Sequence, residues 1–70
     1  SDVVRVRIRY NNGLEDLEKK IKVGSVLTKL EEPSREGYKF VGWYLGDEEY
    51  HFTESISKDI TLEARWEEIE

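Results

Sequence analysis

Few residues in this chain are of types that could do chemistry. The one histidine, His51, lies close in sequence to Ser55, Ser57 and Asp59, so a serine–histidine–aspartate triad can be written. The Gly-x-Ser-x-Gly nucleophile elbow is absent, and no glycine run offers an oxyanion hole. The sequence therefore predicts a protein that is not an enzyme and has no catalytic residues, with His51 as a partly exposed strand residue.

Three neighbouring carboxylates, Asp47, Glu48 and Glu49, form a cluster that could attract a hard cation. Calcium takes six or more oxygen ligands, and the Asp-x-Asp-x-Asp-Gly spacing of its common loop is absent here. The chain also contains no cysteine and therefore neither disulfides nor thiolate ligands. We expect a solvated turn at these acids, with no metal and no cofactor.

Aromatic side chains crowd the stretch GYKFVGWYLG at residues 37–46. An aromatic ring buries about 150–250 Å², and a short chain without disulfides or metals has few other means of stabilisation. Core packing is therefore the first explanation for Tyr38, Phe40, Trp43 and, near the C-terminus, Trp66. The alternative is that Trp43 or Tyr44 lies exposed as a platform for a glycan or a peptide.

Length and charge limit the classes of partner. Seventy residues make one domain, spanning 1–70, and a chain of this size buries only about 60% of its unfolded surface. Eleven basic residues against 16 acidic ones give a net charge of −5, which argues against a nucleic-acid partner. The apolar runs are far shorter than the ~20 residues of a membrane span. We expect no membrane insertion.

The N-terminal third predicts a β-hairpin. Residues 4–10 alternate strictly between apolar side chains and the arginines Arg5, Arg7 and Arg9, as in a half-buried strand. The arginines are expected to form a solvated outer face, with an anion-binding stripe as the alternative. Asn-Asn-Gly at 11–13 then favours a chain reversal. Residues 14–23 fit a helix or a strand, and we favour a strand over about 17–23.

A short helix is expected next. Ser25 can cap a helix of about two turns that carries Val26, Leu27 and Leu30 inward before Pro33 ends it. So short a helix is stable only when it packs on a sheet.

The rest of the chain predicts three strands. In the strand that begins at Tyr38, period-2 alternation places Phe40 and Trp43 on opposite faces. Gly42 in mid-strand indicates either a bulge or a place where a large ring lies across the backbone. A short strand is expected at 50–52, and residues 60–66 alternate as a one-sided final strand. The expected fold class is α+β, a β-grasp-like (ubiquitin/SUMO-like) mixed sheet packed on one short helix, if the first and last strands are neighbours at the centre of the sheet.

Sheet edges are candidates for binding, since an exposed edge can add a peptide strand. Lys20 and Lys22 lie on one candidate edge, although lysines also protect edges from aggregation, and we favour protection. With Trp43, Tyr44 and Tyr50 they form the candidate interaction surface. The partner class, protein or glycan, is left open, and the isolated domain is expected to be a monomer.

Two spaced motifs resemble the Listeria/Bacteroides repeat family, also called the internalin B-repeat family. The first is the Gly-Tyr-x-Phe-x-Gly-Trp-Tyr pattern that begins at Gly37, preceded by Gly24 and Pro33, and the second is the Asp-Ile-Thr-Leu-x-Ala-x-Trp pattern that ends at Trp66. Phe52 lies between them. The resemblance covers nearly the whole chain and is least distinctive in the N-terminal strand.

The resemblance implies a β-grasp-like module found in tandem on bacterial surface proteins. It implies a non-enzymatic structural or adhesion unit, acting as a spacer or as a protein or glycan interaction unit in an extracellular, cell-surface location. The regular VRVRIR strand and the dense Glu/Lys surface depart from a natural repeat. They raise the alternative of an engineered stand-alone scaffold with no evolved function.

Overall fold

Strands make up all the regular structure in residues 2–69, the part of the chain that the computed structural model describes. They are β1 (Val3–Arg9), β2 (Leu17–Lys22), β3 (Ser25–Val26), β4 (Tyr38–Leu45), β5 (Glu48–Glu49), β6 (Ser55–Ile56) and β7 (Ile60–Glu68). The described residues include no helix, and hence none that could span a membrane. The fold is therefore all-β, and the expected α+β, β-grasp-like class with one packed helix is wrong.

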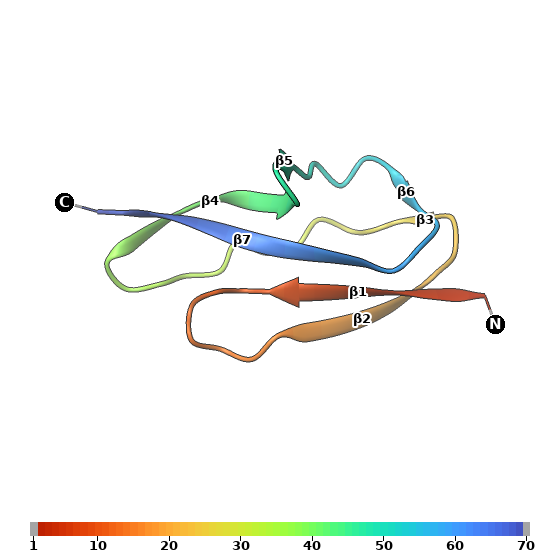
Figure 1. Ribbon diagram of the computed structural model, residues 1–70, viewed down its shortest axis with the longest axis horizontal. Helices are drawn as coiled ribbons and strands as arrows, with labels where there is room; N and C mark the ends of the chain where they lie inside the picture. Colours follow the sequence, from red (N-terminus) through yellow and green to blue (C-terminus); the bar gives the residue numbers. More distant parts are fainter. Residues whose placement is uncertain (1, 70) are drawn as a thin grey trace.

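The main sheet has five strands in the order β2-β1-β7-β4-β5, and β3 and β6 form a separate two-stranded sheet (Figure 1). β1 and β7 are parallel neighbours, with Val6 opposite Ile60 and Arg9 opposite Glu63. The other pairings are antiparallel. The first and last strands thus lie side by side near the middle of the sheet, as the β-grasp hypothesis required, but without its helix.

The segment expected to form the helix is extended instead. Ser25 pairs with Ile56 and Val26 with Ser55 in the small sheet, so Ser25 is a strand residue and not a helix cap. Leu27 is 3% exposed and Leu30 packs against the core. Two turns of helix are too short to be stable without help, and the extended chain buries these leucines while pairing its backbone with β6.

The first hairpin confirms the strand interpretation of residues 17–23. β1 and β2 pair from Val3 opposite Lys22 to Ile8 opposite Leu17. The turn between them uses positive backbone φ angles, 54° at Asn11 and 92° at Gly13, a region that Asn tolerates and Gly favours.

A bulge in β4 changes which aromatic side chains share a face. Phe40 lies opposite Trp66 but Gly42 lies opposite Arg65, so Val41 is an extra residue in the ladder. An extra residue reverses the alternation beyond it. Phe40 and Trp43 therefore both point to the core and Val41 is exposed. The bulge was predicted from Gly42; the expected opposite faces for Phe40 and Trp43 were wrong.

The short strand expected at 50–52 is also wrong. The returning strand is β5, which pairs Glu49 with Tyr44 and Glu48 with Leu45 across a tight turn. Tyr50 adds one more backbone bond, from its N to the Trp43 carbonyl oxygen at 2.8 Å. Phe52 then has a φ of 61°, which ends the extended conformation.

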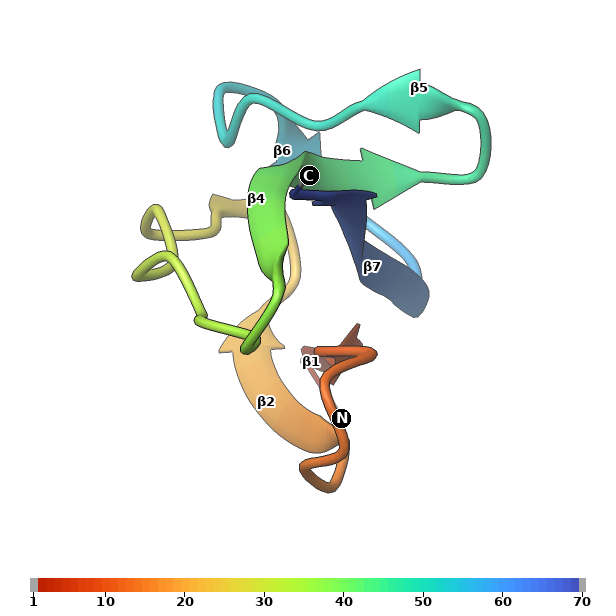
Figure 2. The same ribbon diagram turned by 90° about the vertical axis from the view of Figure 1, so that its left-hand side faces the viewer.

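The core lies on one face of the five-stranded sheet. The chain between β3 and β4 and the small β3–β6 sheet run beside the main sheet (Figure 2). Its buried members are Val4, Val6, Ile8, Leu27, Trp43, Tyr50, Ile56, Leu62 and Ala64. The molecule is elongated, 46 × 22 × 18 Å. The chain enters and leaves at opposite ends of the long axis, because β1 and β7 run in the same direction (Figure 1).

Candidate functional site

Trp43, one of the candidate surface residues, lies inside the core. Its side chain is 3% exposed, and its ring meets Tyr10 and Phe40 edge-on, with centroids 5.8 and 5.5 Å apart. Trp66 packs against Phe40 at 5.5 Å and donates its Nε1 hydrogen to the Tyr10 carbonyl oxygen at 2.8 Å. Edge-to-face pairs of this kind stabilise a core beyond the area they bury. The burial of Trp43 and the packing of the partly buried Phe40 and Trp66 against the core agree with the core interpretation. Tyr38 does not belong to the core cluster, so the interpretation is wrong for that residue.

Tyr50, a second candidate, is also buried, at 7% exposed. Its ring contacts Phe52 at 4.9 Å. Burial, with the Glu54 carboxylate as a smaller cause, raises the pKa of the Tyr50 phenol above its usual 10.0, because both disfavour the charged form. Among the described residues, the Tyr50 hydroxyl and the Trp43 Nε1 have no hydrogen-bond partner.

Tyr44, the third aromatic candidate, lies on the other face of the sheet and is half-buried. The Arg65 guanidinium covers its ring, with Cζ 4.0 Å from the ring centroid. Arg65 also donates to the Gly46 carbonyl oxygen at 3.0 Å and lies 3.7 Å from the Asp47 carboxylate. A cation over an aromatic face is a stabilising contact, so one face of the Tyr44 ring is already occupied.

The arginines of β1 point outward, as predicted, and acids accompany them. Arg5 lies 3.6 Å from Glu18, while Arg7 and Arg9 lie 3.6 and 3.8 Å from Asp16. Arg9 also pairs with Glu63 of β7 at 3.2 Å. These pairs balance the arginine charge, which favours the solvated outer face over an anion-binding stripe.

Lys20 and Lys22 are exposed on β2, the strand at one margin of the sheet. They share the outer face with the arginines, because Lys20 lies opposite Arg5 and Lys22 opposite Val3. Neither belongs to an ion pair among the described residues. Of the five candidate residues, the structure therefore places these two lysines together on an open surface and the three aromatics elsewhere.

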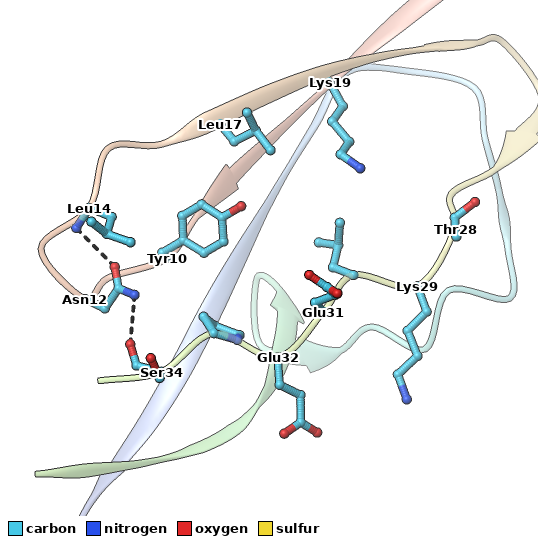
Figure 3. Close-up of a pocket in the computed structure, with 12 residues that line it drawn as sticks. Tyr10, Asn12, Leu14, Leu17, Lys19, Thr28, Lys29, Glu31, Glu32 and Ser34 are labelled. Carbon is cyan, nitrogen blue, oxygen red and sulfur yellow. Dashed lines mark hydrogen bonds between the residues drawn. The ribbon is translucent and has the colours of Figure 1, made fainter. Parts of the chain in front are cut away.

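A hollow of about 630 Å³ lies on the core side of the sheet between β2 and the extended segment 28–34 (Figure 3). Tyr10, Leu17 and Lys19 line one side of it, and Asn12 closes one end by donating to the Ser34 carbonyl oxygen at 3.0 Å. Sequence reasoning missed this groove because it placed a helix in the segment that forms the opposite wall.

The structure does not assemble the residues written as a catalytic triad. His51 is exposed, and the Asp59 carboxylate accepts a hydrogen bond from the Arg5 backbone N at 2.9 Å. No hydrogen bond within residues 2–69 joins His51 to Ser55, Ser57 or Asp59. The same residues hold no group of three or more His, Cys, Asp or Glu side chains able to bind a metal ion.

Comparison with protein families decides the membership of this chain. The family model of the Listeria-Bacteroides repeat domain matches residues 7–65. The chain belongs to the Listeria-Bacteroides repeat domain family. This repeat family is the one that the Gly37 and Trp66 motifs indicated, while the internalin B-repeat name stays a prediction.

Two relatives of this repeat domain come from Evansella cellulosilytica. One, named "Putative membrane protein", is 34% identical over 70 aligned residues, which cover 94% of this chain and 10% of that protein. The other, named "Putative Gly-rich membrane protein", is 36% identical over 66 residues, covering 89% of this chain and 8% of that protein. The chain thus spans about a tenth of the length of the curated relatives it matches.

Proposed function

We propose that this repeat domain is a non-enzymatic structural module, a spacer in a bacterial surface protein. The observation that carries the proposal is the position of the two chain ends. The parallel neighbours β1 and β7 place them at opposite ends of a body 46 Å long and about half as wide (Figure 1). Each copy of a repeat with this shape therefore lengthens the protein by about the long dimension of the module.

The relatives support a surface role. Both are about ten times longer than the aligned region, and both carry names of membrane proteins. A module that occupies a tenth of such a protein has the size expected of one unit in a longer extension. The family is a repeat family, which agrees with serial use.

The spacer role is favoured over a glycan or peptide platform by the state of the aromatic side chains. Trp43 and Tyr50 are buried, and Arg65 covers Tyr44. Stacking on a sugar or a peptide uses an exposed ring face, and of these three aromatics only the half-buried Tyr44 retains an uncovered face, opposite Arg65.

Small-angle X-ray scattering on one, two and three linked copies of the chain tests the spacer role. The expected result is a maximum dimension that grows by about 46 Å with each added copy. The matched control joins the same copies through a Gly/Ser linker of about 20 residues, which behaves as a flexible coil. A three-copy array as compact as a single folded body of equal mass would contradict the proposal.

A further inference from the structure

β2 is the outermost strand on one side of the main sheet, because β1 is its only neighbour there (Figure 1). An edge strand carries a row of backbone N–H and C=O groups that can pair with another chain. The identity and direction of those groups in β2 follow from its register with β1.

The backbone groups that face outward can be identified from one hydrogen bond. The Val23 N donates to the Asp2 carbonyl oxygen at 2.8 Å, so these two opposite residues form a hydrogen-bonded pair. Such pairs recur every second residue in an antiparallel ladder. Ile21, Lys19 and Leu17 therefore bond toward β1. The outward-facing backbone groups belong to Glu18, Lys20 and Lys22.

An independent contact agrees with this assignment. Lys20 lies opposite Arg5, and the Arg5 N donates away from β2, to Asp59 on the β7 side, at 2.9 Å. The Arg5–Lys20 pair is thus one that does not exchange backbone bonds. Within residues 2–69, the backbone of 17–22 has no bond outside the main sheet.

The charges along this edge have a self-complementary order. Asp16 and Glu18 precede Lys20 and Lys22 on the same face of the strand, since Asp16 contacts Arg7 and Glu18 contacts Arg5 there. When such a strand is turned end for end, its lysines meet the acids of an identical strand. Lys20 and Lys22 disfavour pairing of the β2 edge with most other strands. They do not disfavour pairing with the β2 strand of a second copy, whose acids lie opposite them.

We propose that the β2 edge pairs with the β2 edge of a second copy of this chain, antiparallel and about a two-fold axis. The pairing goes beyond the spacer role, since it joins modules side by side. In the register with the best charge match, Glu18 lies opposite Lys20 of the second copy and Asp16 opposite its Lys22, and symmetry repeats both pairs. Opposite charges across two strands stabilise their pairing.

The side chains on the other face support the same register. Leu17, which is 41% exposed, lies opposite Ile21 of the second copy, so both gain apolar cover. Lys19 lies on the two-fold axis, opposite itself. A shift to a neighbouring register allowed by the backbone exchanges this Lys19–Lys19 pair for a Lys20–Lys20 pair, so each register carries one like-charge pair. The shifted register retains only one kind of opposite-charge pair, Glu18 with Lys22, and loses the Leu17–Ile21 contact. The first register is therefore preferred.

The pairing is expected to be weak, because it joins a few backbone bonds and exposed charges. The expected dissociation constant is about 1 mM. Modules held close on one surface have effective concentrations in the millimolar range. A pairing of this strength leaves the free domain a monomer in dilute solution and operates between neighbouring extensions.

Cysteine cross-linking tests the pairing and its register, because the chain has no cysteine of its own. Opposite residues that do not exchange backbone bonds have Cα atoms about 4.5 Å apart, within the range that a disulfide bridges. The proposed register brings Lys19 to this position against itself. The Lys19→Cys variant should form a disulfide-linked dimer at least tenfold faster than the matched control Lys22→Cys, which lies opposite Asp16.

Two results would overturn the proposal. If the Lys19→Cys and Lys22→Cys variants formed disulfide-linked dimers at equal rates, the β2 edges would meet by random collision and not in a fixed register. Fastest cross-linking of a Lys20→Cys variant would mean that the register is wrong. Circular dichroism spectra of the reduced variants show whether they keep the fold.

Substitutions that reverse the charges of β2 test whether a second copy of this chain is the partner of the β2 edge. The Lys20→Glu/Lys22→Glu variant has an all-acidic edge, and the Asp16→Lys/Glu18→Lys variant has an all-basic one. In sedimentation equilibrium at about 1 mM, each should associate at least tenfold more weakly than the original chain, while an equimolar mixture should recover association. Two outcomes would contradict pairing between copies. In one, the mixture of the two variants stays monomeric; in the other, the original chain stays monomeric while an acidic peptide binds the β2 edge.

Discussion

The inner and outer faces of the five-stranded sheet hold side chains of opposite kinds. On the inner face of β1, Val6 and Ile8 are fully buried, whereas on the outer face Arg5, Arg7 and Arg9 are each about half exposed. Burial of a large apolar side chain stabilises by about 1.5–3 kcal/mol, while an exposed ion pair contributes roughly 0–1 kcal/mol. The inner face therefore supplies most of the folding stability, and the outer face contributes little to it.

The largest expected effect is on the inner face. Leu62→Ala removes a fully buried side chain and should lower the free energy of unfolding by about 2–5 kcal/mol. Its exposed neighbour on the outer face, Thr61, is the control, and Thr61→Ala should change the same quantity by no more than about 0.5 kcal/mol. Guanidinium denaturation followed by tryptophan fluorescence measures both. Similar losses from the two variants would remove the distinction between the faces.

A milder substitution on the inner face keeps the test possible if the Leu62→Ala variant does not fold. Ile8→Val deletes one methylene group from a fully buried side chain and should cost about 0.5–1.5 kcal/mol of unfolding free energy. Val3, on the same strand, is 48% exposed, and Val3→Ala should cost less than Ile8→Val in the same titration. The reverse order would contradict the inner-face account.

A pH-dependent effect is expected from Tyr50 in alkali. The pKa of Tyr50 is raised above 10.0 in the folded chain, so the folded state holds its proton more tightly than the unfolded state. Its contribution to stability is complete below pH 10 and is lost as pH rises through the folded-state pKa. Tyr50→Phe should therefore lose less stability than the original chain between neutral pH and strong alkali. Tyr44→Phe is the control, and identical pH profiles for the Tyr50 variant and the original chain would oppose this explanation.

The smallest expected effect lies on the outer face. Asp16→Asn removes the carboxylate that lies within 3.8 Å of both Arg7 and Arg9. The expected loss is no more than about 1 kcal/mol in low salt, and it should shrink further in about 1 M salt, where screening acts over roughly 3 Å. Urea titrations at the two salt concentrations measure it. A loss as large as that of Leu62→Ala would overturn the comparison.

Some of this fold could be predicted from the sequence because local patterns determine it. Strict alternation identified β1 and the final strand, and the Asn-Gly turn required a hairpin partner for β1, which is β2. Gly42 indicated the bulge in β4. Each of these signals lies within a few residues of the element it specifies.

The rest depends on contacts between distant parts of the chain. Leu27 and Leu30 have the spacing of a helix face, yet Ser25 finds a strand partner in Ile56, 31 residues further along. A pattern of period 2 also cannot show where an extra residue enters a ladder, so it could not place Phe40 and Trp43 on the same face.

The candidate surface was predictable only in part, for the same reason. The exposure of Lys20 and Lys22 followed from the alternation in β2. The burial of Tyr50 did not, since it depends on packing against Phe52 beyond the hairpin turn. The outward direction of the β2 backbone required the register with β1.

In the proposed spacer role, the parallel β1–β7 pair connects the two ends of the module and carries the load between them. Tension on the termini acts along both strands in opposite directions, so the bonds from Val6–Ile60 to Arg9–Glu63 must shear together and not open one by one. Single-molecule force spectroscopy on linked copies tests this directly. The control attaches one handle at a Glu15→Cys substitution in the β1–β2 loop and the other at the C-terminus. The β1–β2 loop lies toward the same end of the molecule as the C-terminus (Figure 1). Pulling through the termini should require a clearly higher unfolding force than pulling through the control attachment, and equal forces would contradict the claim.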